Sequence, residues 1–300
     1  MTSSPLKRTL LLIIILALGV SACAPDLEPT ATSTPTSTQT ATITPTITAT
    51  PVPLAATVNG EGITQAEYQA ELARFHSAQA ALGKTVAPED ASRQVLDDLV
   101  SQVLLARGAQ AAGFSLDEAA LQERVDRLAE QVGGAKQLAA WEAAHGYSDE
   151  SFRLALRRQI LAAWMRDTIV AAVPEIAEQV HVQQILFYNS DIAQQVLGQL
   201  KAGADFAAMA ALYDPATQGE LGWFPRGYLL QPEIETAAFA LQPGEISDVI
   251  QTSAGYHILK VLARDPAHLL SPDARLTLQE KALAGWLQEQ QTASTIVLTP

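Results

Sequence analysis

Hydrophobic residues in the first folded half of the chain recur at helical spacing. Between residues 64 and 172, apolar side chains return every three or four positions in successive stretches, as they do along the buried face of an amphipathic helix. Glycines interrupt the pattern, for example Gly113 and Gly133. The pattern predicts helices at about 64–82, 88–112, 135–144 and 148–169, and a further helix that Ser115 or Asp117 opens and that ends near residue 132.

Signals for the start of a helix support these boundaries. Thr64 precedes the first helix and Glu67 follows it three residues later, which is the arrangement of a capping box. Ser148 opens the last of these helices in the same way. Residues 56–63, just before the first helix, predict a short strand and a turn. We therefore expect a helical domain over residues 55–172.

The pattern changes after Pro174. Short apolar segments bounded by glycines now alternate with short helical stretches, which is typical of an α+β domain with an antiparallel-type sheet. Strands are expected at 180–188, 219–224, 246–252 and 257–262, and helices at 192–200, 206–212, 233–240 and 273–291.

The first residues are typical of an export signal. Lys7 and Arg8 precede an apolar run from Leu10 to Val20. This run has about eleven residues, whereas a membrane-spanning helix needs about 20. It therefore predicts the hydrophobic part of a cleaved signal peptide over residues 1–22 rather than a transmembrane helix.

Cys23 directly follows this segment and is the only cysteine in the chain. The sequence Val20-Ser21-Ala22-Cys23 resembles a bacterial lipobox, in which the cysteine thiol receives a lipid. The alternative is an ordinary small residue after a signal cleavage site. Because a single acyl chain binds membranes only marginally, stable anchoring at Cys23 implies a diacylglyceryl-type modification.

Residues 23–54 carry this cysteine and a low-complexity tract. Threonine occupies every even position from Thr30 to Thr50, with prolines between the threonines. Proline cannot donate to a β-ladder, and the tract has no apolar face to bury. We expect a disordered stalk that lifts the folded domains away from a membrane.

The net negative charge of the chain bears on which kinds of molecule it can bind. The chain has 19 Lys and Arg against 32 Asp and Glu, a formal net charge of −13. Phosphate backbones would repel such a protein, so nucleic acid is disfavoured as a partner. The histidines outside the site discussed below show no metal-ligand spacing with carboxylates.

Short motifs lie along residues 179–265. They are VQQIL at 182–186, GADFA at 203–207, GELGWF at 219–224, AFALQPGEIS at 238–247 and GYHIL at 255–259. In these motifs the segment resembles the parvulin (PpiC/rotamase) family of peptidyl-prolyl isomerases. The motifs follow one another in the order of the family and cover the whole domain. The resemblance implies a parvulin domain over residues 176–266.

On the N-terminal flank of this segment, VNGE at 58–61 is followed by the long predicted helices. This flank resembles the N-terminal chaperone domain of the SurA/PrsA-type extracytoplasmic foldases. The resemblance implies an all-helical SurA-N-like domain, onto which the C-terminal helix at 273–291 packs. It also implies an extracytoplasmic protein, lipid-anchored to a membrane, whose partners are unfolded or newly exported polypeptides that contain X-Pro bonds.

The resemblance also implies site residues. His257 matches the second family histidine, Asp214 falls on the acidic or cysteine position of the active loop, and Gln184 replaces the first histidine. The alternative for Asp214 is a loop aspartate that makes a turn before Pro215. A glutamine amide can still exchange a hydrogen bond with His257, so the pair can survive the replacement.

The resemblance implies an apolar pocket for the proline ring, for which four residues are candidates. Leu229 or Leu230 stands where the family commonly has methionine, and an insertion at Gln231 leaves the register open by one residue. Ile234 replaces the usual phenylalanine, and Phe239 lines the pocket or belongs to the core.

Two functions of different class follow from this sequence. The first is a membrane-anchored prolyl cis–trans isomerase that assists the folding of exported proteins and needs no metal or cofactor. The second is a holdase chaperone whose weakened parvulin domain only binds extended chains. Gln184 and Ile234 favour the second function, whereas His257, Asp214 and the GELGWF segment favour the first. A structural cell-envelope lipoprotein is a weaker third alternative.

Overall fold

The computed structural model describes residues 52–299. The predicted signal peptide, Cys23 and most of the predicted stalk lie outside these residues. None of the described helices combines the length and the apolar character that a membrane crossing requires.

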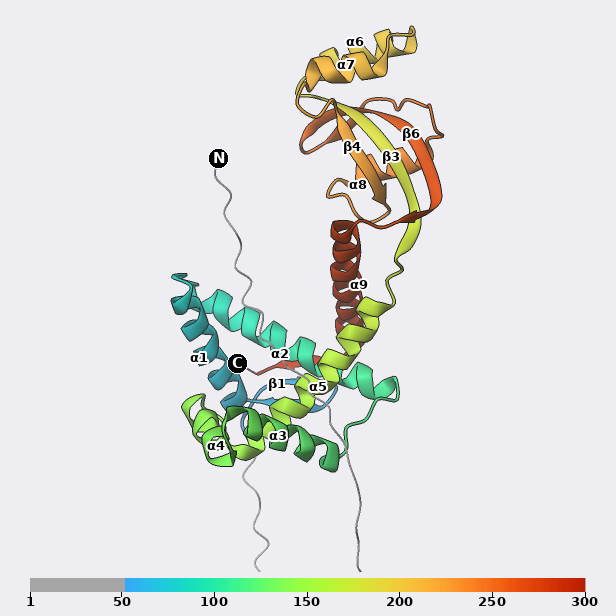
Figure 1. Cartoon of the computed structure of the whole chain (residues 1–300). Coiled ribbons are helices and arrows are strands. Elements are labelled where there is room, and N and C mark those ends of the chain that lie inside the picture. The colour runs from blue at the N-terminus through green and yellow to red at the C-terminus, as the bar shows by residue number, and fades with distance from the viewer. Residues whose placement is uncertain (1–51, 300) are drawn as a thin grey trace, which may run out of the picture. The chain divides into compact units, whose positions relative to one another are not determined.

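The helices predicted before Pro174 are all confirmed, with ends within about two residues. They are α1 (Gln65–Ala81), α2 (Pro88–Ala111), α3 (Glu118–Val132), α4 (Ala135–Ala144) and α5 (Asp149–Ala171) (Figure 1). Thr64 caps α1 by accepting a hydrogen bond from the Glu67 amide at 3.1 Å. The Glu67 carboxylate does not complete the predicted capping box, because it binds the buried guanidinium of Arg158 instead.

A small sheet joins the two ends of the described chain. It contains β1 (Leu54–Val58), β2 (Glu61–Thr64) and β7 (Ile296–Leu298) in the antiparallel order β2-β1-β7. The sequence predicts an all-helical domain apart from a short strand and turn, and β7 is an addition to that prediction. The sequence does not predict β7 because its three residues are too few to show a periodicity and because its partner, β1, lies at the other end of the described chain.

The last helix, α9 (Pro272–Ala293), packs against α2 and α5. Leu287 of α9 contributes to the same apolar cluster as Val95 and Leu99 of α2. Trp286 lies so close to Gly108 that a Cβ atom on this glycine would be 2.6 Å from the indole ring. A Cβ atom at residue 108 would therefore require the Trp286 ring to shift at this contact between α2 and α9.

The second sheet holds the strands predicted after Pro174. It has the antiparallel order β4-β3-β6-β5 (Figure 1), with β3 and β6 longer than the sequence predicts. Its strands are β3 (Ile176–Phe187), β4 (Glu220–Pro225), β5 (Ile250–Thr252) and β6 (Gly255–Leu269), and its helices are α6 (Ser190–Lys201), α7 (Phe206–Tyr213) and α8 (Pro232–Ala240). The α+β class and the antiparallel sheet are confirmed.

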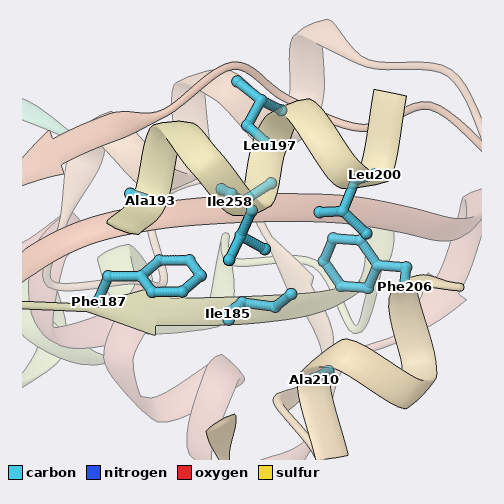
Figure 2. Close-up of a cluster of buried hydrophobic side chains, with 9 residues drawn as sticks. Ile185, Phe187, Ala193, Leu197, Leu200, Phe206, Ala210 and Ile258 are labelled. Carbon is cyan, nitrogen blue, oxygen red and sulfur yellow. The ribbon is translucent and has the colours of Figure 1, made fainter. Parts of the chain in front are cut away.

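Strand alternation gives this sheet two different faces. Ile185 and Phe187 of β3 and Ile258 of β6 pack under α6 and α7, in the cluster shown in Figure 2. Val182 and Leu259 point to the opposite face and pack with residues of α8. Successive side chains on a strand point to opposite faces. The face that carries Val182 therefore also carries Gln184 and Leu186.

Candidate functional site

Two neighbouring strands bring Gln184 and His257 together. Gln184 of β3 pairs with Leu259 of β6, and His257 pairs with Leu186, so the two polar residues are diagonal neighbours on one face. The His257 Nδ1 atom lies 3.0 Å from the Gln184 Oε1 atom. The pair expected from the sequence is therefore formed by the register of two strands.

His257 is held in its neutral form by burial. Its side chain is almost fully buried, with 4% of the residue exposed. Burial lowers the pKa of the imidazole below its usual value, because the charged form loses its hydration. At neutral pH the ring therefore donates one hydrogen bond and accepts one.

Thr252 provides the second partner of this ring, and sequence reasoning missed it. The Thr252 Oγ1 atom lies 2.9 Å from the His257 Nε2 atom and accepts a hydrogen bond from the Ala254 amide at 3.1 Å. Thr252 is the last residue of β5 and pairs with Gly255 across the turn into β6. A threonine at the turn between β5 and β6, shortly before His257, is the sequence signal that could have identified this partner.

The hydrogen bonds that join Thr252, His257 and Gln184 in one line have a consistent order of donors and acceptors. With the Gln184 amide oxygen toward the ring, His257 Nδ1–H donates to Gln184 and Nε2 accepts from the Thr252 hydroxyl. Neither ring nitrogen is left free for proton transfer. The line of Thr252, His257 and Gln184 is therefore a fixed polar array rather than an acid–base pair.

Asp214 lies at the C-cap of α7, and its carboxylate stays within its own loop. It accepts hydrogen bonds from the Thr217 hydroxyl and from the amides of Thr217 and Ala216 at 3.1 and 3.2 Å. These bonds, led by the Thr217 hydroxyl, lower the pKa of Asp214 below its usual value. Within the described chain, no bond joins this carboxylate to His257 or Gln184. The geometry matches the alternative expectation of a turn-forming aspartate.

Gly219 fastens this loop to the Gln184 strand. Its carbonyl accepts a hydrogen bond from the Gln184 amide at 2.8 Å. Its φ is +73°, and a Cβ atom here would lie 2.0 Å from the Gln184 carbonyl oxygen. Only glycine fits so close an approach at a positive φ. The first glycine of the GELGWF segment is thus a requirement of loop packing beside the site.

The apolar residues expected to bind proline fall into different environments. Leu229 is half-buried and packs against the cluster that includes Ile234, which is 3% exposed. Leu230 is 90% exposed and contributes nothing to that cluster. Of the two leucines that the open register allows, Leu229 is therefore the one that lies against the apolar cluster.

Phe239 lies in the core of the domain, in the same apolar cluster as Ile234. It is 5% exposed and packs edge-to-face on Phe224. The guanidinium of Arg226 covers its ring at 4.0 Å. Leu221 of β4 was not among the predicted pocket residues, but it is partly buried against the same cluster as Leu229.

Metal chemistry finds no support in the described residues. Across residues 52–299, no three histidine, cysteine, aspartate or glutamate side chains gather as metal ligands would.

Family models match both parts of the chain. Residues 169–263 match the PPIC-type PPIASE domain, and residues 7–137 match the SurA-like N-terminal domain. The chain is 30% identical over 234 residues to the foldase protein PrsA of Caldanaerobacter subterraneus subsp. tengcongensis, which covers 69% of this chain and 72% of that protein. This chain belongs to the PrsA foldase family. The parvulin and SurA/PrsA resemblance of the sequence is thereby confirmed.

Other relatives of this PrsA-family chain are covered less completely. The PrsA foldase of Geobacillus kaustophilus is 28% identical over 189 residues, which are 59% of this chain and 64% of that protein. The chaperone SurA of Methylobacillus flagellatus is 27% identical over 248 residues, which are 70% of this chain and 56% of that protein. The chain thus spans between about half and three quarters of the length of these curated relatives.

Solved structures give the same names at lower similarity. The PrsA crystal structure from Bacillus anthracis has 23% identity and a TM-score of 0.41, covering 66% of this chain and 96% of that chain. The PrsA structure from Bacillus cereus has 20% identity and a TM-score of 0.43, covering 80% of this chain and 88% of that chain. Because both TM-scores are below 0.5, the family assignment rests on the sequence matches.

Proposed function

We propose that this chain is an extracytoplasmic foldase that catalyses cis–trans isomerisation of X-Pro bonds in exported polypeptides. One observation carries the proposal beyond the family match. A fixed polar line of Thr252, His257 and Gln184 lies on the same sheet face as the apolar cluster that contains Leu229 and Ile234. A polar line beside an apolar pocket is what a twisted prolyl amide requires.

The reaction needs no covalent step. Rotation about the X-Pro bond costs about 20 kcal/mol, because the amide loses its resonance as ω twists. An enzyme accelerates the rotation by binding the twisted amide better than either planar form. A water-poor site does this in part by withdrawing the solvation that stabilises the polar, planar amide. Burial of His257 is consistent with such a site.

The two kinds of group have separate roles in this proposal. Leu221 and Leu229, which are only partly buried, hold the pyrrolidine ring, which has no polar group to satisfy, and the buried Ile234 belongs to the cluster against which they pack. The fixed line ending in Gln184 and His257 supplies dipoles that do not reorganise as the amide twists. No step transfers a proton to or from these residues, and none uses a metal or cofactor.

A holdase without isomerase activity is the second candidate, and specific observations favour it. Gln184 stands where the parvulin resemblance implies a histidine, and the Asp214 carboxylate is bound within its own loop. A domain that binds extended chains without twisting their prolyl bonds would need only the apolar surface.

A protease-coupled assay on a prolyl tetrapeptide decides between these candidates. We expect the protein to accelerate isomerisation above the uncatalysed rate. His257→Ala should lower kcat/KM more than Gln184→Ala does, because His257 contacts both other members of the line. We expect a loss of about tenfold for His257→Ala, the worth of about one hydrogen bond to a buried polar group.

The assay has a matched control and a clear contrary outcome. Gln184→His should retain or raise activity, since an imidazole can replace the amide as the partner of His257. If the wild-type protein gives no acceleration and still suppresses aggregation of an unfolded client, the isomerase proposal fails and the holdase remains. If Gln184→Ala loses more activity than His257→Ala, the assignment of the central residue is wrong.

Attachment to a membrane through a lipid on Cys23 is part of this proposal. It is supported by the lipobox-like sequence at residues 20–23 and by the apolar run before it. Expression in a bacterium with a radiolabelled fatty acid should label the wild-type protein and leave Cys23→Ala unlabelled. Equal labelling of both proteins, or none, would remove the anchor from the proposal.

A further inference from the structure

A carboxylate holds the loop that carries Leu229. This loop, residues 226–231, connects β4 to α8. Glu235 lies in the first turns of α8, and its Oε1 atom accepts a hydrogen bond from the Gly227 amide at 2.6 Å. Its Oε2 atom accepts a second one from the Leu229 amide at 3.2 Å. One side chain therefore binds two backbone amides of the loop.

Helix electrostatics alone do not account for this contact. A carboxylate near a helix N-terminus is stabilised by the helix dipole wherever its side chain points. Glu233 lies in the same turn of α8, is exposed, and forms no hydrogen bond or ion pair with the residues that the structure describes. Glu235 instead reaches back beyond its own helix to the loop.

Backbone geometry at Gly227 fits the carboxylate contact. The φ of Gly227 is +82°, a conformation that residues with a Cβ rarely adopt. A Cβ atom here would also lie 3.2 Å from the Leu278 side chain. Bonds from amides to an ionised carboxylate are about twice as strong as bonds between neutral groups. The loop is therefore held in one conformation at Gly227, two residues before Leu229, and at Leu229 itself.

Glu235 directly follows Ile234, which belongs to the apolar cluster. Ile234 points into the cluster against which Leu229 packs, and Glu235 fixes the Leu229 backbone. With its amide held, Leu229 directs its side chain onto this cluster while Leu230 stays 90% exposed. The first turns of α8 thus supply both a core residue of the cluster on which Leu229 packs and the clamp for Leu229 itself.

We infer that Glu235 is the positioning residue of the proline pocket, which it shapes by holding Leu229 and not Leu230 against the apolar cluster. This inference rests on the proposed function, because it assumes that the Leu229 pocket receives the proline ring. Glu235 acts through the loop and needs no contact with the reacting amide.

The test compares Glu235→Gln with Glu233→Gln in the full chain. Both variants remove one negative charge from the start of α8, but only the first replaces a carboxylate oxygen with an amide group that faces a backbone N–H. For a prolyl tetrapeptide we expect Glu235→Gln to raise KM about tenfold and to change kcat by less than about twofold. The pocket grips the ring equally in the planar and twisted amide, so KM carries the loss. Glu233→Gln should match the wild type.

A second measurement separates loop anchoring from catalysis. Amide hydrogen exchange at Gly227 and Leu229 should be at least about tenfold faster in Glu235→Gln than in Glu233→Gln, with core strand amides unchanged. A loss of overall stability would instead accelerate exchange throughout the domain. If the wild-type protein proves inactive, the dissociation constant of the same peptide replaces KM, and it should rise about tenfold.

These readouts distinguish the failure of the inference from the failure of the proposed function. An inactive wild type with a weaker-binding Glu235→Gln overturns the isomerase proposal and supports the clamp. Unchanged exchange at Gly227 and Leu229 overturns the clamp. Faster exchange with unchanged KM and dissociation constant overturns the link between the loop and the pocket.

Discussion

At the scale of single residues, the site depends on a buried imidazole without a charged partner. His257 is bonded by an amide and a hydroxyl, and neither group stabilises an imidazolium as a carboxylate would. Burial therefore acts unopposed and lowers the pKa of His257. The replacement of a histidine by Gln184 does not break the line, but it makes the site electrically neutral.

Stability should fall as the pH falls through the usual histidine pKa. The folded-state pKa of His257 is lowered, so the unfolded chain takes up its proton first as the pH drops below about 6.5. This group alone should reduce the free energy of unfolding by up to about 1.4 kcal/mol per pH unit in that window. Urea unfolding between pH 7.5 and pH 5.5 measures it.

His257→Asn is the control for this pH dependence. Asparagine keeps two polar atoms near Thr252 and Gln184 but does not titrate. The variant should show a smaller slope of stability against pH than the wild type. Equal slopes in the two proteins would mean that His257 is not the group that titrates in this window.

At the scale of elements, the site exists because two strands and one loop meet. The register of β3 and β6 makes Gln184 and His257 neighbours, and the β5–β6 turn adds Thr252. The loop from Asp214 to Gly219 is tied down at both ends, by the Asp214 carboxylate and by the Gly219 carbonyl. The Asp214 carboxylate thus contributes to the shape of this loop.

Gly219→Ala should disrupt this junction. The new methyl group would meet the Gln184 carbonyl oxygen at 2.0 Å, so the loop and the strand must separate. We expect isomerase activity to fall more than about tenfold and stability to fall by more than about 2 kcal/mol, because strain at positive φ adds to the clash. The tetrapeptide assay and urea unfolding measure the two effects.

Gly222→Ala is the matched control. Gly222 has nearly the same φ, +74°, but a Cβ atom there would have no neighbour within 4 Å. It should therefore show only the conformational cost of about 1–2 kcal/mol and keep most of its activity. Similar losses of activity in both variants would show that close approach at Gly219 is not what the site requires.

At the scale of the whole molecule, the C-terminal segment closes the helical domain. Trp286 and Leu287 of α9 pack on α2, and β7 then pairs with β1. The Asn59 amide donates to the Thr295 carbonyl at 2.8 Å, which joins the turn after β1 to the residue before β7. The helical domain is thus completed by residues that follow the isomerase domain in the sequence.

Two adjacent residues of β7 test this closure. Ile296 packs against the cluster of α1 and α2, whereas Val297 is 54% exposed. Ile296→Ser should reduce the free energy of unfolding of the helical domain by about 2 kcal/mol, because it removes apolar burial. Val297→Ser should cost less than about 1 kcal/mol. Thermal unfolding followed by helix circular dichroism measures both, and equal costs would mean that β7 does not contribute to the core.

The sequence by itself determined the local elements and the family. The predicted helices were recovered because a 3.6-residue period and residues such as Thr64 act over a few positions of chain. Short motifs were enough to predict the strands between residues 180 and 262. They were also enough to assign Gln184 and His257 to neighbouring positions. In each case the information lies within one element or one motif.

Only the tertiary structure decided the questions that depend on distant partners. The Glu67 carboxylate does not complete the predicted capping box because it binds Arg158, which lies 91 residues further along the chain. Leu229 rather than Leu230 faces the apolar cluster because Glu235 holds its amide, and Thr252 joins the site because a turn directs it at His257. β7 pairs with a strand at the other end of the described chain. A side chain's choice among several possible partners is fixed by packing and by competing hydrogen bonds, and these exist only once the chain has folded.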